Sequence, residues 1–157
     1  MPDEALSVAL EREHREIDSG IASFVEMLDE GSVQHEPLLL AMDALRRHIY
    51  AEETFLFPPI RKAGLVMPVF VMMREHGQLW RTMDVLAGQL ADGADTAQLR
   101  LTCSQLLGQL DQHNAKEEPV IYPHADTDLP APVNSELAKF LETGQTPASW
   151  VCQQAVQ

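Results

Sequence analysis

Two segments of the chain repeat the same order of histidine, glutamate, aromatic and proline residues. Corresponding residues of the two copies, such as His48 and His113, lie 65 positions apart. The copies are His48-Ile49-Tyr50-Ala51-Glu52-Glu53 with Phe57-Pro58, and His113-Asn114-Ala115-Lys116-Glu117-Glu118 with Tyr122-Pro123. A shorter repeat precedes each copy, as Arg12-Glu13-His14 and Arg74-Glu75-His76. Histidine and glutamate bind metals, so this pattern predicts a metal site built from two similar halves.

The glutamate of each copy follows its histidine by four residues, so on a helix both side chains share one face. The four histidines of the repeat also fall among apolar residues at helical spacing, which predicts that they face a core. A buried ionised carboxylate without a partner is very costly, and a bound metal would supply the counter-charge. We therefore predict six metal ligands: His14, His48, Glu52, His76, His113 and Glu117.

The other histidines and the acidic neighbours are expected to have different roles. His35 lies in the expected loop before the second helix and His124 falls outside the repeat, so neither is expected to touch the metal. Four further glutamates are turned away from the ligand face, and they either face solvent or accept hydrogen bonds behind the ligands. They are Glu13, Glu53, Glu75 and Glu118. The methionines of the third segment, Met72 among them, are expected to fill the core.

The ligand types narrow the choice of metal. Imidazole and carboxylate together suit iron, manganese or zinc, and the absence of thiolate argues against an iron–sulfur cluster. Two His-x3-Glu units on antiparallel helices can place both carboxylates between two ions. With two imidazoles, an oxygen from each glutamate and a bridging oxo or hydroxo group, each octahedral ion keeps one open position. An open position predicts binding of O2, NO, peroxide or water, whereas structural metal sites are normally closed.

Hydrophobic periodicity predicts that four amphipathic helices carry these residues. Their expected beginnings are near Pro2, after Pro37, near Pro68 and after Asp95. Their expected ends or bends are Gly31, Pro58-Pro59, Gly93, and Pro119 with Pro123. No segment alternates with period two for long enough to indicate a sheet. The chain is therefore predicted to be all-α, an up-down-up-down four-helix bundle with a short extra C-terminal helix or tail.

The chain is long enough for one domain over residues 1–157, with the bundle at about 3–125 and a C-terminal extension at about 126–157. Within the extension, residues 133–143 are expected to form a short helix. Residues 144–157 are expected to be a loose tail whose one large apolar group, Trp150, packs on the bundle.

The composition of the chain limits which binding partners and which cellular compartment are expected. The net charge of −13 repels phosphates, so nucleic acid is not an expected partner. No apolar run approaches the roughly 20 residues that span a bilayer, so no membrane partner is expected. The N-terminus lacks the apolar core of an export signal, which favours the cytoplasm. Cys103 and Cys152 form no CxxC pair and are expected to stay reduced.

The ligand order His14, His48-x3-Glu52, His76, His113-x3-Glu117 resembles the hemerythrin-like (HHE cation-binding) di-iron proteins over roughly residues 5–125. Leu56-Phe57-Pro58 and Glu75-His76 add to the resemblance, which implies a carboxylate-bridged non-haem centre of two iron ions. Oxygen-carrying hemerythrins have a second histidine one turn earlier on the third helix and an aspartate on the fourth, where this chain has Met72 and Glu117. The ligand set is more similar to the di-iron domain of iron–sulfur cluster repair proteins, but their N-terminal cysteine pair is not found here, so a repair role is not carried over.

Three functions fit such a centre. The first is a protein that binds or senses O2, NO or peroxide and passes the change to a protein partner, and this is the expected one. The second is an enzyme or iron donor in nitrosative or oxidative stress defence. A general acid near the centre would favour an enzyme, yet neither Tyr50 nor Tyr122 clearly lies on the ligand stripe. The third, iron storage, is disfavoured because one bundle holds only two ions.

Overall fold

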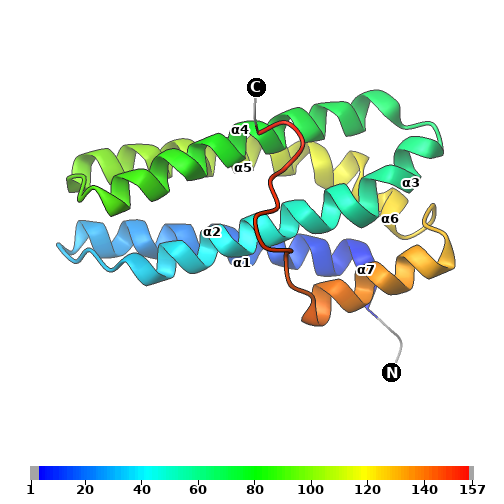
Figure 1. The fold of residues 1–157 in the computed structure, drawn as a ribbon, viewed down its shortest axis with the longest axis horizontal. Coiled ribbons are helices and arrows are strands. Elements are labelled where there is room, and N and C mark those ends of the chain that lie inside the picture. Colours follow the sequence, from blue (N-terminus) through cyan, green and yellow to red (C-terminus); the bar gives the residue numbers. More distant parts are fainter. Residues whose placement is uncertain (1–3, 156–157) are drawn as a thin grey trace.

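Four long helices form an antiparallel bundle in the computed structural model of the chain, which describes residues 4–155 (Figure 1). The elements in chain order are α1 (Leu6–Asp29), α2 (His35–Ala51), η1 (Glu52–Leu56), α3 (Phe57–Lys62), α4 (Val66–Ala91), α5 (Thr96–Val120), α6 (Tyr122–Ala125) and α7 (Ala131–Thr143). Helix α1 packs on α2 and α5, and α4 packs on α5 and α2, which closes the ring of four. The predicted all-α four-helix bundle is confirmed.

Several helices begin before, or continue through, the prolines that were expected to mark their ends. Helix α2 begins at His35 rather than after Pro37, so His35 is not in a loop. Helix α4 begins at Val66 and includes Pro68. The first turn of a helix has no intrahelical use for its N–H groups, so proline is tolerated there. Helix α5 continues through Pro119 and ends at Val120. The expected start near Pro2 lies outside the described residues, and α1 begins at Leu6.

The second histidine motif ends in a π-helical turn. The backbone N–H of Phe57 donates to the carbonyl of Glu52, five residues earlier, and η1 joins α2 to α3 without a break in the helical path. Pro58 and Pro59 lack the N–H groups that would continue the ordinary helical hydrogen bonds. The widened turn directly before the prolines accommodates this loss, so the chain stays helical to Lys62.

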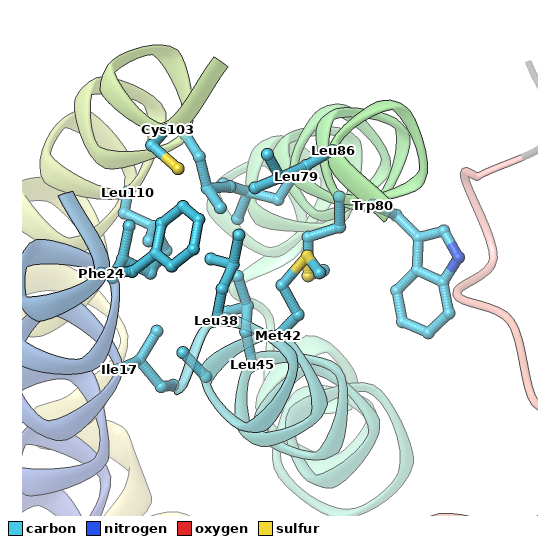
Figure 2. Close-up of a cluster of buried hydrophobic side chains, with 14 of the residues drawn as sticks. Ile17, Phe24, Leu38, Met42, Leu45, Leu79, Trp80, Leu86, Cys103 and Leu110 are labelled. Atoms are coloured by element: carbon cyan, nitrogen blue, oxygen red, sulfur yellow. The ribbon is translucent and has the colours of Figure 1, made fainter. Parts of the chain in front are cut away.

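The bundle core consists of two apolar clusters with a polar layer between them. One cluster fills the end that contains the α1–α2 and α4–α5 connections, and the other fills the end near α3, α6 and α7. Along α1, for example, His14 separates Leu10 of the second cluster from Ile17 of the first. Figure 2 shows the first cluster, where side chains meet from all four long helices, among them Phe24, Leu38, Leu79 and Cys103. The apolar clusters therefore fix the helices on both sides of the polar layer.

The C-terminal extension is held against the bundle. Helix α7 confirms the expected short helix, and the segment after it crosses α2 and reaches α4 (Figure 1). Trp150 packs on the bundle as expected, with its ring centroid 5.0 Å from that of Tyr50 and 5.5 Å from that of Trp80. Cys152 is buried beside them. The expectation of a loose tail is wrong for residues 144–155. None of the helices within residues 4–155 is both long and apolar enough to cross a membrane.

Candidate metal centre

The polar layer contains all six residues that the sequence predicted as metal ligands. Each of them is at most 3 % exposed. Helix α1 supplies His14, the junction of α2 and η1 supplies His48 and Glu52, α4 supplies His76, and α5 supplies His113 and Glu117. They form two sets of four donors, one with His14 and His48 and the other with His76 and His113. Glu52 and Glu117 belong to both sets, and the donor atoms of each set lie within 4.8 Å of one another.

The two shared glutamates connect the two histidine pairs. Glu52 places Oε2 3.1 Å from Nε2 of His48 and Oε1 3.1 Å from Nε2 of His76. Glu117 places Oε1 3.1 Å from Nε2 of His14 and 3.4 Å from Nε2 of His113. Each carboxylate therefore lies between one imidazole of each half, which is the arrangement expected of a bridging ligand.

Each histidine is oriented by a carboxylate behind it. The Nδ1–H groups donate to glutamate oxygens over 2.8–2.9 Å, and the pairs are His14 with Glu118, His48 with Glu13, His76 with Glu53 and His113 with Glu75. In the neutral imidazole a proton at Nδ1 leaves the lone pair on Nε2, which is the atom that faces the centre. Of the two roles left open for these glutamates, the structure shows hydrogen bonding to the histidines.

Tyr122 is the residue of this layer that the sequence reasoning missed. Its side chain is fully buried, and its hydroxyl lies 2.8 Å from Nε2 of His14 and 3.1 Å from Nε2 of His48. The hydroxyl donates to Oε2 of Glu52 over 2.6 Å. The available signal was the 65-residue offset, which pairs Tyr122 with Phe57 in the repeat. Tyr50 lies elsewhere, against Phe55 and Phe140.

The imidazoles and carboxylates stabilise one another's charged forms. Burial alone would lower the pKa of His113, but the carboxylates of Glu117 and Glu75 outweigh it and raise the pKa to about 10. Burial alone would raise the pKa of Glu52, but His48 and His76 hold it well below its ordinary value. Burial and the nearby Glu117 and Glu52 carboxylates raise the pKa of Tyr122 well above its ordinary value. Without metal, therefore, protons on imidazoles balance the buried carboxylates.

Several atoms of the layer have the properties expected of metal donors. Among the described residues, the buried atoms without a hydrogen-bond partner include Oε1 of Glu52, Nε2 of His76 and both carboxylate oxygens of Glu117. Leaving such groups buried and unpaired is costly. A cation between the two histidine pairs would satisfy all of them, and imidazole with carboxylate is a donor set that suits iron, manganese or zinc. The residues present therefore fit a bound metal.

The residues excluded from the site lie away from it. His35 is exposed at the start of α2, and His124 pairs with Asp128 on α6 and the turn after it, with Nδ1 2.5 Å from Oδ2. Met72 is buried in the second apolar cluster, where it fills the core as expected. Both cysteines are free and buried, and burial raises the pKa of the Cys103 thiol to about 11.

Comparison with known proteins agrees with the geometry of the layer. The family model of the hemerythrin HHE cation-binding domain matches residues 5–125, which include all six candidate ligands. Searches of curated proteins and of solved structures gave no significant match. A matching family model over most of the chain, together with buried histidine and glutamate groups that fit a cation, identifies the chain as a metal-binding member of the hemerythrin HHE cation-binding family.

Proposed function

We propose that the chain binds two iron ions in the polar layer and that it binds or senses O2, NO or peroxide there. Manganese and zinc suit the same ligand chemistry and are the competing metals. In this proposal His14 and His48 hold one ion, His76 and His113 hold the other, and Glu52 and Glu117 bind both.

The observation that carries this proposal is that two sets of four buried donors share both glutamates. A single ion would not need four imidazoles on opposite sides of two carboxylates. Each set supplies four protein donors, and an octahedral ion requires six, so the set leaves room for small ligands. A site of this kind is suited to small-molecule chemistry rather than to a structural role.

The chain's own residues prepare the layer for this chemistry. Glu13, Glu53, Glu75 and Glu118 fix the ring orientation of the four histidines. The apolar clusters on both sides keep water out of the layer and strengthen its electrostatic interactions. A pair of iron ions would supply one-electron redox chemistry and positions at which a small ligand can bind.

A second candidate function is supported by Tyr122. A buried hydroxyl 2.6 Å from Oε2 of Glu52 could donate a proton during the reduction of NO or peroxide, which would make the protein an enzyme of stress defence. Iron donation for iron–sulfur cluster repair belongs to the same class. Binding or sensing remains the proposed function, because the hydroxyl already contacts the donor groups of His14, His48 and Glu52.

The full chain loaded with iron tests these functions. Metal analysis should find two irons per chain, and fewer than two would contradict the proposed centre. The protein is then reduced without oxygen, and optical spectra are recorded as O2, NO or hydrogen peroxide is added. A reversible optical change supports binding or sensing, whereas continued consumption of NO or peroxide supports the enzyme. Selective loading with zinc from a mixture of metals, with no response of the iron form, would refute both.

A further inference from the structure

The two halves of the polar layer are related residue by residue. His14 corresponds to His76, His48 to His113 and Glu52 to Glu117, and the carboxylates behind the histidines follow the same rule. Glu118 of the second half contacts His14 of the first, and Glu53 of the first half contacts His76 of the second. The other two carboxylates contact histidines of their own halves: Glu13 contacts His48, and Glu75 contacts His113. The matched contacts indicate an approximate two-fold relation between the halves.

The aromatic residues of the two motifs, Phe57 and Tyr122, have equivalent ring positions but differ in their chemical groups. The ring of Phe57 stacks on His76 with centroids 5.4 Å apart and planes at 22°. The ring of Tyr122 stacks on His14 with centroids 5.2 Å apart and planes at 27°. Both side chains are at most 1 % exposed. The equivalent positions differ by one hydroxyl group, which only the tyrosine has.

That hydroxyl lies on the side of the layer that contains His14 and His48. Its three partners are Nε2 of His14, Nε2 of His48 and Oε2 of Glu52, at 2.8, 3.1 and 2.6 Å. His14 and His48 belong to one set only, and Glu52, which both sets share, presents the oxygen that lies 3.1 Å from Nε2 of His48. Nε2 of His76 in the other set has no hydrogen-bond partner among the described residues. A phenol oxygen this close to three donors of one ion lies where it can bind the same ion.

We propose that Tyr122 is a seventh protein ligand, which binds the ion held by His14 and His48 through its phenolate oxygen. The inference rests on the proposed function, because it requires metal in the layer. When metal binds, the bond between Tyr122 and its proton breaks, a bond from the oxygen to the metal forms, and the proton leaves to solvent without any electron transfer. Phe57 supplies no such ligand, so exogenous small ligands bind at the ion of His76 and His113.

Tyrosine spectroscopy on metal-loaded protein tests the inference. The chain contains only two tyrosines, so Tyr50→Phe is a matched control that leaves Tyr122 as the single tyrosine. Zinc loading should give the ultraviolet difference spectrum of one ionised tyrosine in the wild type and in Tyr50→Phe. Iron(III) loading should give a phenolate-to-iron charge-transfer band in the same two proteins. Both signals should be lost in Tyr122→Phe.

The reverse substitution tests the asymmetry. Phe57→Tyr restores the hydroxyl at the equivalent position, and it should strengthen the phenolate band and weaken the binding of azide, used as a small-anion probe, to the iron(III) form. Tyr122→Phe should leave azide able to bind at both ions. Equal azide stoichiometry in the wild type and in Tyr122→Phe would contradict the assignment of the exogenous ligand to one ion.

Metal analysis separates the failure of this inference from that of the proposed function. Two metals per wild-type chain without a tyrosinate signal would overturn the role of Tyr122 and leave the metal centre intact. Retention of the signal in Tyr122→Phe would also overturn it. Absence of metal from a wild-type chain that is folded by circular dichroism would overturn both proposals. If Tyr122→Phe does not fold, the zinc difference spectra of the wild type and Tyr50→Phe still decide the matter.

Discussion

The carboxylate of Glu53 connects the histidine layer to the backbone of Gln153. Its Oε2 accepts a hydrogen bond from Nδ1 of His76 over 2.8 Å, and its Oε1 accepts one from the backbone N–H of Gln153 over 3.1 Å. Arg81 holds the same segment by donating to the carbonyl of Gln154 over 2.9 Å. Glu53 therefore takes part both in holding the C-terminal segment and in orienting a candidate metal ligand.

Gly77 allows the C-terminal segment to approach α4 this closely. A Cβ atom at Gly77 would lie 2.6 Å from the carbonyl oxygen of Gln154, which belongs to the backbone and cannot turn aside. We expect Gly77→Ala to destabilise the protein by about 1–3 kcal/mol through overpacking. It should also weaken metal binding, since Gln153 would move away from Glu53. Urea unfolding and metal competition measure the two effects.

Gly88 on the same helix is the matched control. An added Cβ there meets nothing within 4 Å. Gly88→Ala should stabilise the protein by about 0.5–1 kcal/mol, because alanine loses less conformational entropy in a helix. Equal unfolding free energies for the Gly77 and Gly88 variants would show that the segment does not pack on α4 in solution.

The carboxylates behind the histidines should control metal affinity. Glu118→Ala removes the acceptor for Nδ1 of His14, and such partners of metal ligands typically change affinity by about 10–100-fold. Asp111→Ala is the control, because Asp111 is an exposed acid on the same helix and contacts none of the four histidines through a described hydrogen bond. Competition with a chromogenic chelator measures both affinities. A similar loss in the two variants would indicate a general charge effect instead.

The shared glutamates should be required for the second ion. Glu52→Ala and Glu117→Ala each remove donors from both sets, so neither variant should retain two metals per chain. His35→Ala and His124→Ala should bind as much metal as the wild type, since both histidines lie outside the layer. Elemental analysis after dialysis measures the metal content of each variant. Two irons per chain in both glutamate variants would refute the bridging role.

The stability of the metal-free protein should depend on pH through His113 and Glu75. The pKa of His113 rises from 6.5 to about 10 on folding, so its contribution is fully present below pH 6.5 and is lost as the pH rises through 10. Hydrogen bonds from His113 and Lys116 outweigh burial and lower the pKa of Glu75 from 4.5 to about 2. Its contribution is therefore present above pH 4.5 and is lost as the pH falls through 2. The melting temperature should be highest between these limits, at about pH 4.5–6.5.

Metal affinity should rise with pH, whereas the contribution of His113 to the stability of the metal-free protein falls. A metal ion needs the lone pair on Nε2, so binding must displace the protons that the imidazoles hold in the metal-free protein. We expect affinity to rise with pH across the range from 6.5 to 10. Zinc competition at several pH values measures this dependence, with the total release of protons as a second readout. A flat profile would show that the histidines are already neutral before metal binds.

The sequence predicted the positions of the six candidate ligands because helical spacing and apolar neighbours together determine where they lie. The spacing of four residues from His48 to Glu52 places both side chains on one helix face, and the apolar neighbours determine which face is buried. Tyr122 could not be placed in this way. It follows Ile121, where α5 has ended and helical periodicity no longer applies. The C-terminal segment was also missed, since its docking depends on a close fit at Gly77 rather than on any periodic pattern.

The matched contacts of the two halves are what duplication of a single helical hairpin would leave behind. Two identical hairpins associate about a two-fold axis, because the same surface then meets itself. Such an ancestral dimer would treat its two ions identically, since each hairpin would supply the same aromatic residue. Joining the copies in one chain allows them to diverge separately. The single hydroxyl that distinguishes Tyr122 from Phe57 is a difference that no homodimer of identical hairpins could encode.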